Sequence, residues 1–336
     1  MAAMIEFANI RGVEKIKKGG QATVYKAPPG SLHMKISESV AIKKYSKKAL
    51  LGNERAVEQY LKIMLDNRKD APPDIRGVID QYIIWPRVII YENGEACGFA
   101  MNLIPDRFFV RYDDITGPQY AESNFDFILN DPEIRLRLGL PVLNAHGRVK
   151  ITHDLLMITS QLHKYDIVIG DVSPNNILIY IDPQAQRNNR ALFIDSDSFR
   201  KANHTHPLKQ PHTPNWYPPE SWAAMRLRLQ LERAGGNPNQ IMRYRTIEFI
   251  QNKQTDVYKI CLAVTRLFHD GAQRASVSES SAAYEKMSRE IGEEFALYVY
   301  NGLSANPADR PSGHELYVCF RDAIGQKNKL RGKAPA

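Results

Sequence analysis

The sequence predicts an α+β protein in which a small β-rich part, residues 1–104, precedes a larger and mainly helical part, residues 105–326. Short β-prone runs separated by turn residues dominate the first hundred residues, whereas long stretches with helical spacing of apolar residues dominate the rest. The composition, with 43% hydrophobic and 24% charged residues among 336, is typical of a folded globular chain. That length suffices for one large domain of two lobes or for two ordinary domains.

The β-rich part contains four predicted strands and one predicted helix. The strands are expected at four β-prone runs, Ala22–Lys26, Val40–Lys44, Tyr82–Tyr91 and Cys97–Leu103. Between the second and third runs, Val57, Leu61 and Met64 recur at spacings of four and three, which predicts a helix over Asn53–Leu65. We therefore expect a small antiparallel sheet accompanied by one helix.

The helical part is predicted from two long periodic stretches, Ile151–His163 and Thr255–Phe268. Two other stretches, about 106–148 and 221–254, follow no simple pattern, and we interpret them as insertions. The second of these is rich in arginine, which usually indicates a solvated helix face and less often a site for an acidic partner. The last residues, 327–336, are basic and poor in apolar side chains, so we expect a mobile tail.

The totals argue against several classes of protein. The net charge of +8 could attract nucleic acid, but no ordered motif of basic and aromatic residues accompanies it, so we do not expect a nucleic-acid partner. No apolar run is long enough to span a membrane, and no secretory signal opens the chain. Cys97, Cys261 and Cys319 form no pair or zinc spacing, and we expect reduced thiols in a cytoplasmic protein.

Three polar residues beside two apolar runs carry the first chemical signal. Asp171 is followed five residues later by Asn176 and then by an apolar run, and Asp195 directly follows a second apolar run. Phosphoryl transfer needs a carboxylate that orients the hydroxyl of the acceptor, and oxygen ligands for magnesium. We therefore predict Asp171 as the base and Asn176 and Asp195 as the metal ligands, favouring Asp195 over Asp197 because Asp195 adjoins the strand. Each of these residues alone could simply end a turn.

A lysine and two glycines near the N-terminus carry the second signal. Lys43 lies on a predicted strand, where its amine could bind the phosphates of a nucleotide if a glutamate from the next helix held it. Glu58 is chosen over Glu54 for that role, because its separation from Lys43 better suits a strand, a loop and a helix. Gly19 and Gly20 would let backbone amides approach phosphates closely. In isolation each feature is weak, since a lysine on a strand is usually a solvated charge.

Taken in order, these segments resemble the protein-kinase superfamily, and most nearly the atypical bacterial serine/threonine protein kinases that are similar to eukaryotic ones. The resemblance spans nearly the whole chain, because seven motifs follow the family's order: Gly19–Tyr25, Val40–Lys43, Ile169–Asn176, Ile194–Asp197, Thr213–Glu220, Thr255–Tyr258 and Asn306–Pro311. Each motif is weak or moderate alone. Independent chance matches would not keep this order.

The resemblance implies a two-lobed kinase fold that binds ATP and Mg²⁺ between the lobes and transfers the γ-phosphoryl group to Ser or Thr hydroxyls of a protein substrate, itself included. It further implies that Glu220 pairs with Arg310 and that Asp256 holds the backbone of the catalytic loop. The residues expected around the adenine are Val24, Ala41, Met101, Leu103, Ile104 and Leu178, with backbone hydrogen bonds from Met101–Ile104. It identifies neither the protein substrate nor an oligomeric state.

Departures from the family pattern keep two alternatives open. Gly170 stands where an arginine usually precedes the catalytic aspartate, so we expect activity without phosphorylation of the activation segment. Ser173 replaces the usual lysine, and Gly-Asp at 170–171 is also similar to small-molecule kinases resembling aminoglycoside phosphotransferases. Ser196, where Phe is usual, and the reduced glycine loop favour a pseudokinase scaffold. Retention of the four central residues, Lys43, Asp171, Asn176 and Asp195, argues against a scaffold.

Overall fold

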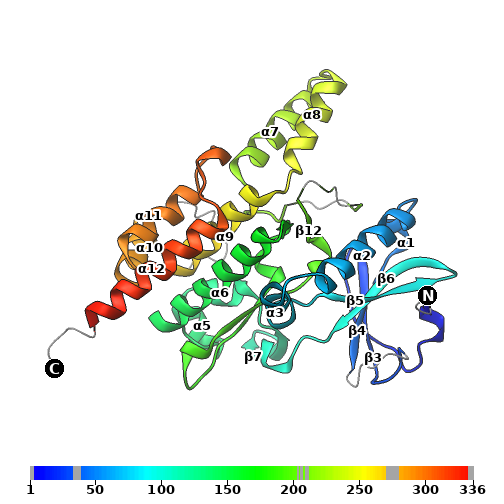
Figure 1. Ribbon diagram of the computed structural model, residues 1–336, viewed down its shortest axis with the longest axis horizontal. Coiled ribbons are helices and arrows are strands. Elements are labelled where there is room, and N and C mark those ends of the chain that lie inside the picture. The colour runs from blue at the N-terminus through cyan, green and yellow to red at the C-terminus, as the bar shows by residue number, and fades with distance from the viewer. Residues whose placement is uncertain are drawn as a thin grey trace. The chain divides into compact units, whose positions relative to one another are not determined.

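The chain forms two compact units, the first of residues 1–106 and 193–210, and the second of residues 107–192 and 211–336. The computed structural model describes residues 4–32, 39–202, 204, 207–208, 212–269 and 280–331. Unit 1 holds a multi-stranded sheet and unit 2 is mainly helical, so the predicted α+β class is confirmed (Figure 1). Residues 193–210, which lie inside the predicted 105–326 part, group with unit 1.

The sheet of unit 1 has six strands in the order β1-β5-β6-β4-β3-β2. The predicted strands are confirmed as β3 (Ala22–Ala27), β4 (Val40–Tyr45), β5 (Pro86–Glu92) and β6 (Glu95–Asn102). Two strands that we did not predict, β1 (Ile5–Glu6) and β2 (Glu14–Lys18), form its edges. The expectation of a purely antiparallel sheet is wrong at one edge, because β1 pairs with β5 in parallel. A turn at Asn93 and Gly94, both with positive φ, joins β5 to β6.

Unit 1 contains more than the one helix predicted. The expected helix is confirmed as α2 (Glu54–Lys69), and the short α1 (Lys47–Leu50) precedes it. A further helix, α3 (Pro73–Tyr82), was not predicted, and its last residue is the one at which we expected a strand to begin. A proline at the first position of a helix loses no hydrogen bond, and α3 buries Ile75, Val78 and Ile79 along one face.

The buried face of α2 covers part of the sheet. Val57, Leu61 and Met64, the residues whose spacing predicted this helix, are buried, and α2 packs against β5 and β6. The indole nitrogen of Trp85, which precedes β5, donates a hydrogen bond of 3.0 Å to the backbone oxygen of Met64. The helix is therefore fixed to the sheet by apolar packing and by one buried polar contact.

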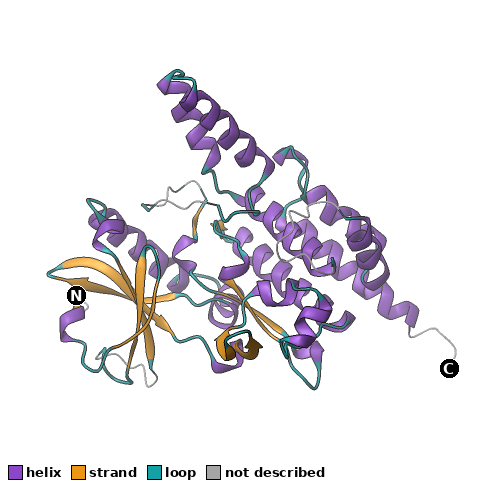
Figure 2. Ribbon diagram, turned by 180° about the vertical axis from the view of Figure 1, so that it is seen from behind, coloured by secondary structure: helices purple, strands orange, loops and turns teal. Residues whose placement is uncertain are grey.

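Unit 2, in which helices predominate (Figure 2), is built around the two helices that periodicity predicted, α6 (Ala145–Lys164) and α9 (Lys253–Phe268). Every residue of α9 from Thr255 to Phe268 is buried, which marks the centre of the core. Three further helices pack around these two: α10 (Ser281–Glu290), α11 (Glu293–Gly302) and α12 (Gly313–Arg331). Because α12 continues to residue 331, the expectation of a tail from residue 327 is wrong for 327–331; residues 332–336 lie outside the described part.

The two stretches without a simple pattern have regular structure. Residues 106–148 contain the 3₁₀ turn η2 (Asp106–Phe108), the hairpin β7 (Phe109–Asp114) and β8 (Gly117–Glu122), and the short helices α4 (Phe125–Leu129) and α5 (Pro132–Arg137). Residues 221–254 hold most of α7 (Pro219–Arg233) and all of α8 (Pro238–Glu248), which pack on each other as a helical hairpin (Figure 1). Short hairpins and paired helices give weak periodic signals, which is why the sequence pattern did not show them.

Short segments complete both units. In the chain order they are η1 (Phe7–Asn9), β9 (Ile167–Val168), η3 (Pro174–Asn176), β10 (Ile177–Tyr180), η4 (Gln186–Asn188), β11 (Arg190–Phe193), η5 (Ser196–Ser198), β12 (Arg200–Lys201) and η6 (Pro307–Asp309). Within the described ranges no helix combines the length and apolar character that crossing a membrane requires. All three cysteines are free thiols, as predicted, and two of them are buried.

Candidate functional site

One face of the unit 1 sheet carries Lys43 together with three of the predicted adenine-contacting residues. Val24 of β3 and Phe99 of β6 lie directly opposite Lys43 of β4, so all three share a face. Ala41 precedes Lys43 by two residues on the same strand and pairs with Met101, which places both on that face too. This face therefore joins small and apolar side chains to one amine, whose side chain is only 14% exposed.

The amine of Lys43 has two carboxylate partners within unit 1. Its Nζ lies 2.7 Å from Asp197 Oδ1 and 3.3 Å from Asp195 Oδ1. The Asp197 side chain is 8% exposed and that of Asp195 is 49% exposed. Burial alone would lower the pKa of Lys43, but the charges of Asp197 and Asp195 outweigh it, so this pKa lies above its ordinary value. Lys43 is therefore a fully charged amine at neutral pH.

Two tyrosines fix Asp197 in place. The hydroxyl of Tyr45 donates to Asp197 Oδ2 at 2.8 Å, and the hydroxyl of Tyr60 from α2 lies 3.0 Å from the backbone oxygen of Asp197 and also contacts that of Phe199. Burial, followed by the charge of Asp197, raises the pKa of both hydroxyls. Both tyrosines therefore remain protonated donors that hold the acidic segment against the sheet.

The turn that carries the two aspartates has a constrained backbone. Asp195 has a φ of 54°, in the left-handed region that non-glycine residues seldom adopt. The hydroxyl of Ser196 donates to the backbone oxygen of Ile84 at 2.5 Å. The 3₁₀ turn η5 then directs Asp197 inward while Asp195 keeps half of its side chain exposed. One acid is thereby used for structure and the other remains accessible.

The role predicted for Glu58 is wrong in this structure. Its carboxylate lies 2.7 Å from Lys62 Nζ, one turn along α2, and accepts a hydrogen bond of 3.1 Å from Tyr91. These contacts, with the Lys62 hydrogen bond first, lower the pKa of Glu58. Among the described residues, the acidic partners of Lys43 are Asp195 and Asp197 instead. The helix presents Tyr60, not a glutamate, toward the segment that holds the lysine.

The remaining predicted nucleotide residues lie at the margins of the sheet or in unit 2. Gly19 and Gly20 form the turn between β2 and β3, where the Gly19 amide donates to the Ala22 oxygen at 2.8 Å. A side chain at Gly20 would meet no atom within 4 Å, so this backbone is open to close approach. Leu103 and Ile104 follow β6 and are half-buried. Leu178, in unit 2, is fully buried on β10.

The predicted catalytic loop of unit 2 brings Asp171 and Asn176 together. The side-chain nitrogen Nδ2 of Asn176 donates to Asp171 Oδ2 and to the Asp171 backbone oxygen, each at 2.9 Å. The hydroxyl of Thr213 lies 3.4 Å from the other carboxylate oxygen of Asp171. The carboxylate is thus oriented from two sides by neutral donors, a geometry that suits an acceptor of a substrate proton.

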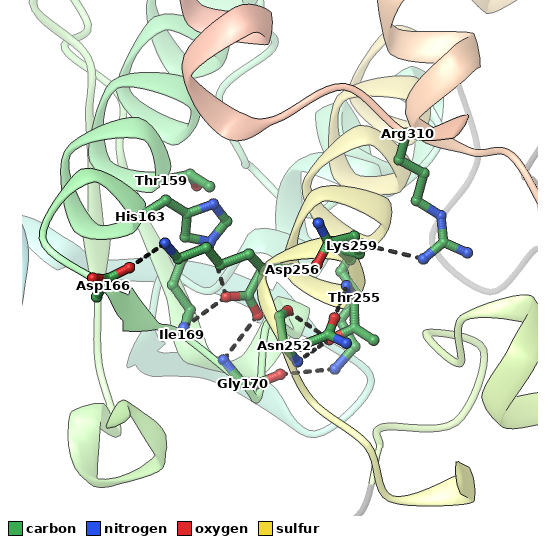
Figure 3. A network of polar contacts seen from close by, with 12 residues as sticks. Thr159, His163, Asp166, Ile169, Gly170, Asn252, Thr255, Asp256, Lys259 and Arg310 are labelled. Carbon is green, nitrogen blue, oxygen red and sulfur yellow. Dashed lines mark hydrogen bonds and ion pairs between the residues drawn. The ribbon is translucent and has the colours of Figure 1, made fainter. Parts of the chain in front are cut away.

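Asp256 of α9 binds the backbone of this loop, as predicted (Figure 3). Its carboxylate accepts hydrogen bonds from the amides of Ile169 at 2.7 Å and Gly170 at 2.9 Å, and it lies 3.1 Å from His163 Nε2. The Asp256 side chain is fully buried. A buried carboxylate needs such donors to offset its desolvation. The contact therefore joins the loop to the most buried helix of the unit.

The predicted pair of Glu220 and Arg310 is also confirmed. Two nitrogens of Arg310 contact the two carboxylate oxygens of Glu220, at 2.9 and 2.6 Å. A third, Nε, donates to the Ser304 backbone oxygen at 2.9 Å. The Arg310 side chain is fully buried, and such forked pairs combine charge with fixed geometry. The pair anchors the start of α7 to the segment before α12.

Sequence reasoning missed three residues of these clusters. Asp197 was passed over because it does not adjoin the strand, although the 3₁₀ turn makes it the closer partner of Lys43. Tyr60 was hidden within an ordinary amphipathic helix. Lys259 interrupts the apolar run of α9 and donates to the Gly170 oxygen at 2.9 Å. A lysine inside an apolar helical run is visible in the sequence, so this signal was available.

The oxygen donors present suit magnesium rather than a softer metal. The half-exposed carboxylate of Asp195 and the side-chain amide of Asn176 are of the type that magnesium prefers, and this ion usually takes few protein ligands in nucleotide sites. Across the described ranges, no group of three or more His, Cys, Asp and Glu side chains is arranged to hold a metal ion. No protein-family model matches the chain, and no curated protein matches it either.

Proposed function

We propose that the chain is an ATP- and Mg²⁺-dependent phosphotransferase with a two-lobed protein-kinase-like fold, which phosphorylates Ser or Thr hydroxyls of proteins. The observation that carries this proposal is Lys43 beside Asp195: a charged amine on a sheet face of small and apolar side chains, 3.3 Å from a half-exposed carboxylate. A nucleoside triphosphate needs both, because the amine contacts its phosphates and the carboxylate holds the metal that accompanies them.

Each central residue has a distinct role in this proposal. Lys43 binds the α- and β-phosphates, and Val24 and Ala41 contact the adenine. Asp171 orients the acceptor hydroxyl and takes its proton. Asp195 and Asn176 would hold Mg²⁺, which would neutralise charge on the phosphates. Most of the rate acceleration then comes from positioning and electrostatic stabilisation and not from covalent catalysis.

A protein acceptor is supported by the segment between Thr213 and α7. Arg310 fixes Glu220 at its end, and Arg266 donates to the Asn215 oxygen at 2.7 Å while its guanidinium lies 4.7 Å from the centre of the Trp216 ring. An ordered surface segment next to Asp171 suits an extended peptide. We also propose a cytoplasmic location, which three free cysteines support.

The test is transfer of label from γ-labelled ATP to the protein itself and to generic basic and acidic peptides in the presence of magnesium. Alanine at Lys43, Asp171 or Asp195 should each reduce transfer by on the order of 10²-fold or more, as loss of electrostatic or base groups does in other enzymes. Lys44→Ala is the matched control, because Lys44 is the next residue of β4, points to the opposite face and pairs with Glu92 at 2.6 Å.

Two other results would redirect the proposal. Magnesium-dependent ATP binding without labelled protein, combined with phosphorylation of a metabolite, would indicate a small-molecule kinase. No ATP binding by calorimetry would indicate a pseudokinase scaffold. A folded Asp171→Ala variant with normal turnover would refute the assignment of the base.

A further inference from the structure

Lys259 is a lysine in the middle of the buried stretch of α9, Thr255–Phe268. Its side chain has no exposed surface, and Tyr258, Ile260 and Cys261 around it are buried as well. Removing a lysine nitrogen from water is costly unless polar partners replace the water. A methionine of similar length would fill the same space without that cost, so packing alone does not account for a lysine at this position.

The Lys259 nitrogen is used to bind the loop that carries Asp171. Its Nζ donates to the backbone oxygen of Gly170 at 2.9 Å. One helical turn earlier, Asp256 accepts from the Gly170 amide at 2.9 Å (Figure 3). Residues three apart on a helix share a face, so a single face of α9 binds both the N–H and the C=O of Gly170.

These two contacts with Gly170 fix the position of the backbone nitrogen of Asp171. The carbonyl of Gly170 and the nitrogen of Asp171 belong to one planar peptide group, so a donor that fixes the carbonyl also fixes the nitrogen of the next residue. Gly170 has a φ of 79°, a conformation that residues with a side chain rarely adopt. The chain therefore turns sharply at Gly170, and Lys259 holds the far side of that turn.

We propose that Lys259 is a positioning residue for Asp171: by holding the Gly170 carbonyl it sets the orientation of the peptide from which the Asp171 side chain departs. This inference rests on the proposed function. It predicts that loss of the amine lowers turnover more than it lowers stability, because the Gly170 carbonyl loses one hydrogen-bond donor while a side chain of similar length still fills the space.

The test compares Lys259→Met with Lys253→Met in the full chain. Lys253 lies on the first turn of the same helix and pairs with Asp166 at 2.5 Å, but its side chain is 32% exposed. We expect Lys259→Met to lower kcat by on the order of 10²-fold, the effect of a misplaced catalytic group, with KM for ATP within about twofold of wild type. Its melting temperature should fall by no more than a few degrees, because only one donor to the Gly170 carbonyl is lost, and amide hydrogen exchange in the peptide 167–176 should become faster. Lys253→Met should change none of these quantities.

The outcomes separate the inference from the proposed function. If the wild type transfers phosphate and Lys259→Met keeps its kcat, the inference is overturned and the function stands. If kcat falls only as far as the fraction of folded protein falls at the assay temperature, Lys259 is structural and the inference is again overturned. If the wild type itself is inactive, the proposed function fails. The positioning role of Lys259 is then tested by hydrogen exchange alone, and unchanged exchange at 167–176 in Lys259→Met refutes it.

Discussion

Lys43 lies between two aspartates whose surroundings differ sharply. Asp197 is buried, bound to Tyr45 and 2.7 Å from the amine, whereas Asp195 is half-exposed and 3.3 Å away. In the proposed reaction the phosphates of ATP must approach an amine that already has a close acidic partner. Asp197 thereby holds the lysine in place, and Asp195 remains accessible for the proposed chemistry.

Separate substitutions should separate these tasks. Asp197→Asn removes the nearest charged partner of the buried amine, and we expect the free energy of unfolding to fall by about 3–5 kcal/mol, as for other broken buried pairs. Asp195→Asn should cost far less stability because the carboxylate is half-exposed, yet it should abolish transfer. Urea unfolding and the labelling assay measure the two quantities. Equal stability losses in the two variants would contradict this division.

The hydroxyl of Tyr60 should contribute to the same cluster. Tyr60→Phe removes the donor to the Asp197 and Phe199 backbone oxygens while retaining the ring, so we expect a loss of about 1–2 kcal/mol. Tyr120→Phe, on the exposed face of β8 with 60% of the residue accessible, is the matched control and should have no measurable effect. Thermal unfolding of the two variants side by side decides the point.

At the scale of elements, the pair of Glu220 and Arg310 joins α7 to the segment before α12. Replacement by Glu220→Gln leaves a buried guanidinium without its charged partner, and we expect a loss of about 3–5 kcal/mol. Glu232→Gln on the same helix, where the side chain contacts Arg228 and Arg245 at the surface, should leave stability unchanged. If chemical denaturation gives the two variants the same midpoint, the buried pair does not anchor α7.

Sequence patterns predicted the elements that have a well-buried face. They failed for an exposed strand and for a helix that begins at a proline. The strands β3 to β6 were expected from their β-prone residues, and the helices α2, α6 and α9 from the spacing of their apolar residues. The edge strand β2 reads Glu-Lys-Ile-Lys-Lys and is exposed throughout, so it has no burial pattern to detect. Helix α3 was missed because it begins at a proline, a residue typical of turns, although proline is tolerated in the first turn of a helix.

The candidate site was predicted in its residue types but not in all its pairings. The contacts of Asp256 and Glu220 followed from ordered motifs, because each binds a partner that a motif also contains. The choice of Glu58 failed because sequence separation does not report which side chain of a helix faces the lysine. The choice between Asp195 and Asp197 depends on a single turn of 3₁₀ helix, whose direction no spacing rule specifies.

At the scale of the whole molecule, nucleotide binding should appear as thermal stabilisation. A ligand that binds only the folded state at about 100 times its dissociation constant adds roughly 2.7 kcal/mol. We therefore expect the melting temperature to rise with ATP and magnesium, and the rise to disappear with a chelator or in Lys43→Ala. Differential scanning fluorimetry at increasing ATP concentration tests this, with Lys44→Ala as control. A rise that survives in Lys43→Ala would place ATP elsewhere.

The first unit is assembled from two pieces of chain, residues 1–106 and 193–210, with part of the second unit encoded between them. Lys43 meets Asp197 across 154 positions, so a growing chain emerging from a ribosome exposes its sheet well before the acidic turn has been made. During that interval the amine, Tyr45 and Tyr60 lack the segment they bind. Closing such a long loop slows folding. The N-terminal unit can be completed only after the intervening stretch has been synthesised, so the part of the chain that is translated first is not the first to finish folding.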